Sequence, residues 1–256
     1  MFKTGKLMVQ VYPDYKEMSA TAANDAGNCI KGVLNQKDEI NIVFSGALSQ
    51  QEFHKYLAKI PGIDWNRINA FSVDEFYCPQ MQKSCTVAQQ PIRDLYNAVN
   101  PKSINLINYK AENIEQECRR YDELIRNNPP DIACLGIGRS GHIALNEPGQ
   151  TDFNDASWVR SVNIPQQSKD QLMKDPNFLD QGFIPDKGIT ITLPALMQSL
   201  YIFVVVPFKE KSEIIKSFFL SGITEALPAT ILKTKENATL YLDRESYSLV
   251  EHYYKV

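Results

Sequence analysis

Four short segments of this chain carry side chains that can bind an anion or move a proton. They are a small-residue turn at 45–49, the carboxylate pair Asp74 and Glu75, the glycine-rich run 136–149, and Lys209. Aspartate, glutamate and histidine are the usual general acids and bases of enzymes. Small-residue turns let an anion approach their backbone N–H groups. These residue types suit acid–base chemistry on a ligand that has an anionic group.

The small-residue turn contains Ser45, Gly46, Ala47 and Ser49, and a helical pattern follows it. Backbone N–H groups at the start of a helix can hold an anion, and glycine permits its close approach. Lys209 would supply a countercharge as a single point donor. The alternatives are an ordinary turn in which Ser49 caps the helix, and a solvated lysine.

The carboxylates of Asp74 and Glu75 follow the apolar run 70–73. Adjacent residues on an extended strand point to opposite faces, so only one of them can aim easily into a cleft. A carboxylate there could act as a general base that moves a proton between neighbouring carbons. The alternative is a pair of surface carboxylates that end a strand.

The run 136–149 reads Gly-Ile-Gly-Arg-Ser-Gly-His-Ile-Ala-Leu-Asn-Glu-Pro-Gly. Its Gly-x-Gly-x-x-Gly spacing is a weak match to a dinucleotide fingerprint, which normally has an acidic residue about 20 positions later. Here His142 follows at once, and Pro148 ends any helix early. His142 and Glu147 could pair for proton transfer, with the carboxylate fixing the imidazole tautomer. The alternative is a buried histidine bonded to backbone.

Strand-like and helix-like stretches alternate along the chain and must position these groups. Strands are expected at 7–12, 40–44, 68–73, 104–107, 131–135, 201–206 and 238–242, and helical patterns at 18–33, 49–60, 114–125 and 214–219. The alternation predicts an α/β fold with a mostly parallel, doubly wound (Rossmann-like) sheet and helices on both faces. Ligands bind beyond the carboxyl ends of such strands, so we expect the four segments to converge on one cleft.

Composition narrows the class of protein. The chain has 256 residues, 43% of them hydrophobic, and this length fits one large α/β domain or two small ones; we predict a single domain over 1–256. The net charge is −3 without a basic block, which argues against a nucleic-acid partner. Five scattered cysteines without a Cys-x-x-Cys pair predict neither a disulfide framework nor a zinc site. Without a signal-like N-terminus or a membrane-length apolar run, we expect a cytoplasmic protein with no membrane partner.

Taken together, these segments resemble the glucosamine-6-phosphate deaminase/isomerase family, and most closely its galactosamine-6-phosphate branch. The run 135–149 is similar to the family signature Gly-Ile-Gly-x-Asp-Gly-His-Ile-Ala-Phe-Asn-Glu-Pro, and 71–76 to its Phe-x-x-Asp-Glu-Tyr segment. The stretch 42–57 stands in the place of its Thr-Gly-x-Thr-Pro phosphate turn, and 226–232 resembles a late segment of the galactosamine branch. The likeness covers nearly the whole chain in the same order.

The resemblance implies isomerisation and deamination of a hexosamine 6-phosphate, which gives a ketose 6-phosphate and ammonia. His142, supported by Glu147, would open the sugar ring, and Asp74 would move a proton from C2 to C1 through an enolamine. No metal or cofactor is implied, and a homo-oligomer is compatible with this interpretation. For binding of the sugar and its phosphate, the resemblance implies Ser45, Gly46, Ala47, Ser49, Gly138, Arg139, Ser140 and Lys209, with Lys174 as an uncertain helper.

The chain departs from the family pattern at two places. Ser140 replaces the usual aspartate before Gly-His, so the orientation of the histidine and the sugar preference can differ from those of the family. Leu48 and Ser49 replace the threonine and proline of the phosphate turn, so the phosphate can bind less tightly or in a different position than in the family. The regulatory basic cluster of the allosteric deaminases is echoed only by Arg160, so no allostery is predicted.

Two other functions remain open at this point. The first is a 6-phosphogluconolactonase, whose signature Gly-x-Asp-Gly-His-x-Ala usually runs into Leu-Phe-Pro. This chain has Leu-Asn-Glu-Pro at 145–148 instead, and thus the glutamate of the deaminase mechanism. The second is a sugar-phosphate binding protein without turnover, which the altered turn and Ser140 would suit.

Overall fold

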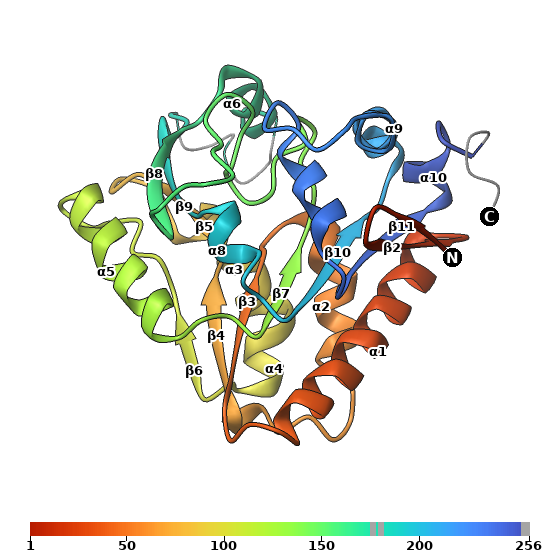
Figure 1. Cartoon of the computed structure of the whole chain (residues 1–256). Coiled ribbons are helices and arrows are strands. Elements are labelled where there is room, and N and C mark those ends of the chain that lie inside the picture. The colour runs from red at the N-terminus through yellow and green to blue at the C-terminus, as the bar shows by residue number, and fades with distance from the viewer. Residues whose placement is uncertain (175–177, 179–181, 252–256) are drawn as a thin grey trace.

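A central eight-stranded sheet and a smaller three-stranded sheet form the frame of the protein in this computed structural model (Figure 1). The structure describes residues 1–174, 178 and 182–251. Helices cover the central sheet, and all but one of its strand pairs are parallel. The predicted α/β fold with a mostly parallel sheet is therefore confirmed.

The strands and helices alternate for most of the chain. The strands are β1 Phe2–Thr4, β2 Leu7–Tyr12, β3 Ile40–Phe44, β4 Ile68–Ser72, β5 Asp74–Tyr77, β6 Ser103–Asn105, β7 Ile132–Leu135, β8 Val159–Asn163, β9 Lys187–Ile191, β10 Tyr201–Val206 and β11 Ala238–Asp243. The helices are α1 Tyr15–Leu34, α2 Gln51–Leu57, α3 Gln89–Pro91, α4 Asn97–Val99, α5 Ile114–Asn127, α6 Gln166–Leu172, α8 Leu193–Leu196, α9 Ser212–Leu220 and α10 Arg244–Tyr247. Short 3₁₀ turns lie at Leu48–Gln50, Trp65–Arg67, Lys83–Cys85, Lys209–Lys211 and Pro228–Thr234, and a π-helical turn at Ile92–Tyr96.

The strand order of the central sheet is β1-β2-β11-β10-β7-β3-β4-β6. From β3 the chain moves outward through β4 to β6, and it then returns to β7 on the other side of β3. The direction of winding therefore reverses between β3 and β7. In open α/β sheets the crevice at such a switch point is the usual ligand site.

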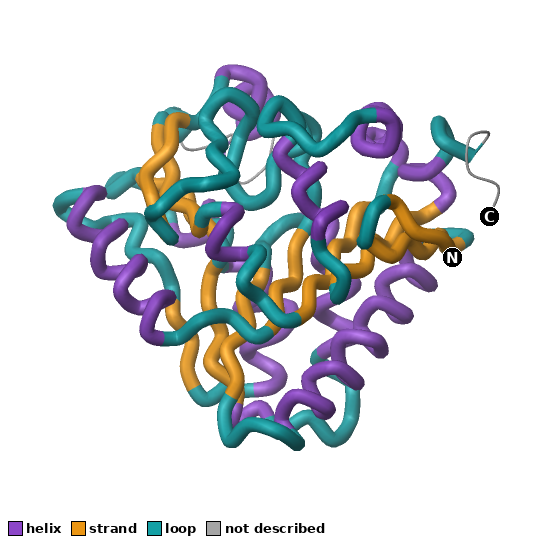
Figure 2. Tube along the Cα trace, in the orientation of Figure 1, coloured by secondary structure: helices purple, strands orange, loops and turns teal. Residues whose placement is uncertain are grey.

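Both faces of the central sheet are buried, each against its own set of helices. On β7, Ile132 and Cys134 belong to the apolar cluster under α1 and α2, while Ala133 and Leu135 belong to the cluster that also contains α5 and α9 side chains. Figure 2 shows α1 and α5 on opposite sides of the strands. Side chains alternate between faces along a strand, so a strand covered on both faces reads as a continuous apolar run.

Local sequence explains where the long helices begin. Asp14 caps α1, since its side chain accepts hydrogen bonds from the backbone N–H groups of Lys16 and Glu17 at 2.8 and 2.9 Å. Asn113 caps α5 by accepting from the N–H of Gln116 at 3.0 Å. Each helix then buries one apolar face within the predicted helical range, which includes Ile30 in α1 and Cys118, Tyr121 and Ile125 in α5.

The three-stranded sheet, in the order β5-β9-β8, was not among the predicted elements. All of its pairs are antiparallel, and β5 begins only two residues after β4 ends. The predicted helix at 49–60 is also shorter, since α2 ends at Leu57 ahead of Pro61. A residue that precedes proline is disfavoured in helical conformation, which limits any extension.

One apolar cluster joins the two sheets, because Ile189 and Ile191 of β9 pack in the same cluster as Val204 of β10. The single domain predicted over 1–256 stays a prediction, which this shared core supports. Among the described residues, no helix is both long and apolar enough to span a membrane.

Candidate active site

The four segments singled out from the sequence lie at one edge of the central sheet. Strands β10, β7, β3 and β4 are consecutive neighbours and parallel to one another, so their carboxyl ends meet. In Figure 1 the arrowheads of β4 and β7 point toward the end of the molecule that carries α6. The strand order therefore places the four segments at one edge of the sheet, and their convergence on a single cleft stays a prediction.

His142 and Glu147 form a direct pair at this edge. Nδ1 of His142 lies 2.8 Å from Oε1 of Glu147 and 2.8 Å from Oγ of Ser140. Ser140 Oγ donates to the other carboxylate oxygen at 2.5 Å, and Ser168 of α6 donates to Oε1 at 2.9 Å. Glu147 therefore receives hydrogen bonds from three side chains.

The electrostatics of this cluster keep the carboxylate ionised. Burial raises the pKa of the Glu147 carboxyl, but the hydrogen bond from His142, the charge that His142 carries when protonated and the two serine hydroxyls outweigh burial and lower it overall. An ionised Glu147 must accept, so it fixes the proton of His142 on Nδ1. Nε2 of His142 is then left with its lone pair for a reacting group.

The glycines of the run 136–149 make room for the histidine. A Cβ on Gly138 would lie 1.9 Å from Nε2 of His142, so no other residue fits beneath the ring. Gly141 has a φ of 84°, a conformation that glycine adopts without strain. No helix begins anywhere in 136–152, so the glycine spacing lacks the helix N-terminus that a dinucleotide pyrophosphate needs.

Asp74 and Glu75 have separate surroundings although both are buried. Glu75 accepts hydrogen bonds from the backbone N–H groups of Phe76, Val87 and Ala88 at 2.9–3.1 Å, so its carboxylate holds the segment at 87–88 in place. Asp74 accepts no side-chain hydrogen bond from any described residue, and burial alone raises its pKa to about 7. Of the two, Asp74 is the carboxylate whose side chain has no hydrogen-bond partner among the described residues.

The Asp74 strand is attached directly to the loop that carries Glu147. Asp74 pairs with Thr190 across β5 and β9, and opposite residues in a sheet project to the same face. Thr190 Oγ1 in turn accepts from the N–H of Leu145 at 3.2 Å, and Nδ2 of Asn146 lies 3.4 Å from it. The three-stranded sheet therefore brings the aspartate to the histidine loop.

The small-residue turn at 45–49 is held tightly on two sides. Ser45 N–H donates to Cys134 O on β7 at 2.9 Å. A Cβ on Gly46 would lie 2.1 Å from Val87 O, so this position requires glycine. The predicted turn thus packs against the same segment that Glu75 holds. Its outer residues Ala47 and Leu48 are exposed.

Tyr15 stabilises the second half of the turn. Its hydroxyl lies 3.1 Å from Leu48 O and 3.3 Å from Ser49 O, and it accepts from the N–H of Glu52 at 3.0 Å. Its ring packs on Phe208 with centroids 4.7 Å apart. Phe208 has a φ of 81°, an uncommon value for a residue with a side chain, and such strain gathers at functional sites.

The lysine predicted from the sequence, Lys209, is exposed, and the next lysine takes the inner position. Lys211 is partly buried, and its Nζ donates to Ile137 O of the histidine loop at 2.8 Å. Burial, followed by the positive charge of Arg139, lowers the pKa of Lys211 to about 8. Glu210 lies 3.9 Å from Arg139 and offsets part of this positive charge, and the two neighbouring cations remain a candidate site for an anion.

Lys211 could have been found from helical spacing, whereas two other residues could not. Lys211 is the N-cap of α9, and its spacing of four and seven residues from the buried Ile215 and Phe218 places it on the same side as the buried face of that helix. Ser168 and Thr190 lie 21 and 43 positions beyond Glu147 in the sequence, and no local pattern links them to it. Lys174, the uncertain helper, is exposed and has no side-chain contact with another described residue.

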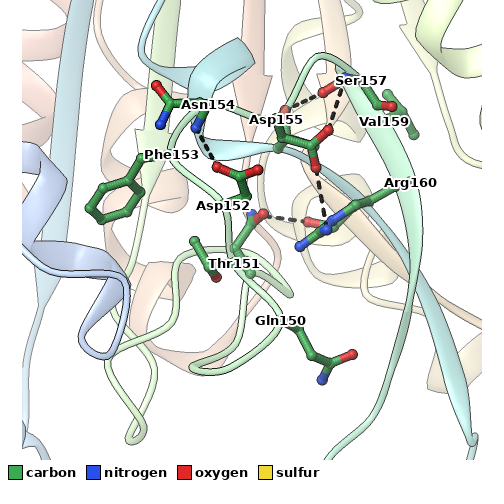
Figure 3. A network of polar contacts seen from close by, with 12 residues as sticks. Gln150, Thr151, Asp152, Phe153, Asn154, Asp155, Ser157, Val159 and Arg160 are labelled. Carbon is green, nitrogen blue, oxygen red and sulfur yellow. Dashed lines mark hydrogen bonds and ion pairs between the residues drawn. The ribbon is translucent and has the colours of Figure 1, made fainter.

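The loop after the histidine run folds on its own polar contacts. Figure 3 shows Asp155 between Ser157 and Arg160, with hydrogen-bond and ion-pair distances of 2.9 and 3.3 Å. The N–H of Asn154 donates to Asp152 at 2.7 Å.

Arg160 also borders a groove of about 430 Å³ between α5 and β8, which none of the predicted site residues lines. No cluster of three metal-ligating side chains occurs among the described residues.

A family model described as glucosamine-6-phosphate isomerases/6-phosphogluconolactonase matches residues 13–241. A glucosamine-6-phosphate deaminase of Streptococcus pyogenes serotype M18 is 29% identical over 199 residues, which is 78% of this chain and 82% of that protein. One of Bacillus thuringiensis (strain Al Hakam) is 29% identical over 187 residues, 73% of this chain and 70% of that protein.

Solved structures agree on the fold. A monomeric glucosamine-6-phosphate deaminase superposes with a TM-score of 0.82 at 24% identity, over 95% of this chain and 100% of that one. A 6-phosphogluconolactonase from Thermotoga maritima superposes with a TM-score of 0.71 at 22% identity, over 93% of this chain and 99% of that one. Enzymes with two different activities therefore share this fold, and only the site residues can distinguish one activity from the other.

Proposed function

The chain belongs to the family of glucosamine-6-phosphate isomerases and 6-phosphogluconolactonases, and we propose that it isomerises and deaminates a hexosamine 6-phosphate. The products would be a ketose 6-phosphate and ammonia. The observation that carries this proposal is the buried Glu147 carboxylate bonded to Nδ1 of His142. It supplies an oriented imidazole for a sugar ring oxygen, and the lactonase pattern has no glutamate at this place.

The first step uses the free Nε2 of His142. This nitrogen takes the proton of the C1 hydroxyl and delivers it to the ring oxygen as the bond between C1 and that oxygen breaks. The product is an open-chain aldehyde that keeps its amino group at C2. Glu147 holds Nδ1–H throughout and stabilises the imidazolium that forms between the two transfers.

The second step belongs to Asp74. Its carboxylate removes the proton from C2 while the C1 oxygen takes up a proton from solvent, which gives an enolamine. Asp74 then returns its proton to C1, and an iminium remains at C2. Water adds there, the C–N bond breaks, and ammonium leaves with formation of the ketone. The raised pKa of Asp74, about 7, suits a base that must both accept and release a proton near neutrality.

The 6-phosphate would be held by the two neighbouring cations and the small-residue turn. Lys211 and Arg139 supply positive charge, and the hydroxyls of Ser45 and Ser49 with the N–H groups at Gly46 and Ala47 supply donors. Gly138 and Ser140 would border the sugar beside His142. In this proposal Lys209, which is exposed, contributes only long-range charge.

Replacing Lys211 with Met should raise KM for the sugar phosphate about 10- to 100-fold with a smaller change in kcat, because a hydrogen bond to a charged group is lost. Steady-state kinetics on the hexosamine phosphate measures this. Lys209→Met is the matched comparison from the same turn, and its effect should stay within about twofold, as for exposed charges. A large effect for Lys209→Met with none for Lys211→Met would return the phosphate role to Lys209.

The decisive test of the reaction is ammonia release without added metal. Purified protein is incubated with glucosamine 6-phosphate and with galactosamine 6-phosphate, and ammonia and ketose phosphate are measured together. Equal amounts of the two products support the proposal. Hydrolysis of 6-phosphogluconolactone instead would identify a lactonase, and binding of either sugar without turnover would identify a binding protein.

We also propose the finer features of this function. None of the five cysteines, all of which lie among the described residues, forms a disulfide, and reduced thiols fit the proposed cytoplasmic location. The relatives named above are glucosamine enzymes, so a preference for galactosamine 6-phosphate stays a prediction that the two-substrate assay decides. A homo-oligomer also stays a prediction.

A further inference from the structure

Gln50 directly follows the small-residue turn at 45–49, and its side chain is fully buried. Its Nε2 donates to the main-chain oxygen of Val205 on β10 at 3.1 Å and to Oγ of Ser49 at 3.2 Å. Its Oε1 has no hydrogen-bond partner among the described residues. A buried amide that is only half satisfied costs free energy, so an apolar side chain would serve packing better.

Val205 determines which way the amide group of Gln50 points. A main-chain oxygen only accepts hydrogen bonds, so an Oε1 placed against it would bring two acceptors together. Nε2 must therefore face Val205, and its second N–H faces Ser49. Gly136 of the histidine loop leaves the necessary space, since a Cβ there would lie 3.0 Å from Nε2.

This orientation makes the Ser49 hydroxyl an acceptor toward Gln50. The hydroxyl's own proton has no acceptor among the described residues, so it is available to an incoming ligand. Ser49 lies in the turn at 45–49, and Lys211 approaches the neighbouring histidine loop. The hydroxyl is therefore presented as a donor at the edge of the sheet where the cations gather.

We propose that Gln50 is a positioning residue that directs the hydroxyl proton of Ser49 toward the phosphate group of the substrate. The inference rests on the proposed function in taking the bound anion to be a sugar phosphate. It also accounts for the altered turn. Leu48 is 72% exposed and has no side-chain hydroxyl, so within 46–49 only Ser49 offers one.

The test measures the dissociation constant of glucose 6-phosphate, a hexose phosphate without an amino group, by titration calorimetry. Gln50→Met and Ser49→Ala should each weaken binding about 10-fold, the loss expected for a donor to a charged group. The double variant should bind no more weakly than either single variant, because Gln50 acts through Ser49. Gln51→Met, from the next position, is the control and should bind as the parent does.

The following binding results would overturn the inference that Gln50 positions Ser49. Unchanged affinity in Gln50→Met, or a double variant whose losses multiply, overturns the inference, as does a parent protein that does not bind glucose 6-phosphate. Gln50→Asn, which keeps an amide but cannot reach Ser49, serves as the second variant if Gln50→Met fails to fold, and it should show the same loss. A parent protein that binds glucose 6-phosphate but releases no ammonia from either hexosamine 6-phosphate refutes the proposed function. The comparison of binding among the variants can still be interpreted in that case.

Discussion

The Asp74→Asn variant is expected to lose at least about 10³-fold in kcat while it still binds the sugar phosphate, because general-base catalysis contributes up to about 10⁴-fold. Asparagine keeps the shape of the side chain but cannot take a proton from C2. Exchange of the C2 hydrogen with deuterated solvent, followed by NMR, measures the step directly. Exchange at the parent rate in Asp74→Asn would show that another group is the base.

Glu75→Gln is the matched comparison, because it changes the adjacent carboxylate in the same way. Glu75 is engaged with backbone N–H groups, so its replacement should lower the free energy of unfolding by about 1–3 kcal/mol, the cost of a buried donor left unpaired. The folded fraction should retain C2 exchange. Loss of exchange in Glu75→Gln alone would reverse the assignment of the two carboxylates.

The pH dependence of kcat/KM provides a second measurement of the Asp74 role. A carboxyl with a raised pKa of about 7 is ionised only above that pH, so kcat/KM should fall about tenfold for each pH unit below it. Lys211, with a pKa lowered to about 8, loses its charge above that pH, which predicts an alkaline decline as well. Lys211→Arg should remove the alkaline decline, and a decline that persists there must come from another group.

The His142→Gln variant is expected to lose about 10²- to 10⁴-fold in kcat/KM on the cyclic substrate, because it lacks the group that carries the proton to the ring oxygen. Only the small open-chain fraction would then react. The rate should therefore stop increasing with enzyme concentration, once spontaneous ring opening in solution becomes limiting. This plateau distinguishes a ring-opening role from a general loss of activity.

Two controls accompany the His142 experiment. Binding of glucose 6-phosphate and the thermal unfolding midpoint should match those of the parent protein, because His142 is partly exposed and its loss leaves Glu147 with two serine donors. C2 exchange of the open-chain fraction should continue through Asp74. A His142→Gln variant that turns over the cyclic sugar at the parent rate would remove the histidine from the mechanism.

Much of the frame could be predicted because it depends on local periodicity. The apolar runs that became β3, β7 and β10 are covered on both faces, so each reads as buried strand without knowledge of its partners. The β5-β9-β8 sheet was missed because its strands are short and β5 follows β4 almost without a break. The exposure of Lys209 and the partial burial of Lys211 could not be predicted from local pattern, because both lie in a 3₁₀ turn that follows Phe208, whose φ is 81°.

The amino-acid sequence alone determined which chemical groups are present and that they follow parallel strands, since strand patterning and residue type are properties of neighbouring positions. Only the tertiary structure decided which of them act together. Ser168 approaches Glu147 from α6, Thr190 joins the Asp74 strand to the histidine loop, and Gln50 faces Val205 across 155 positions of sequence. Hydrogen bonds between such distant residues depend on how the sheets pack, and a linear pattern carries no record of that packing.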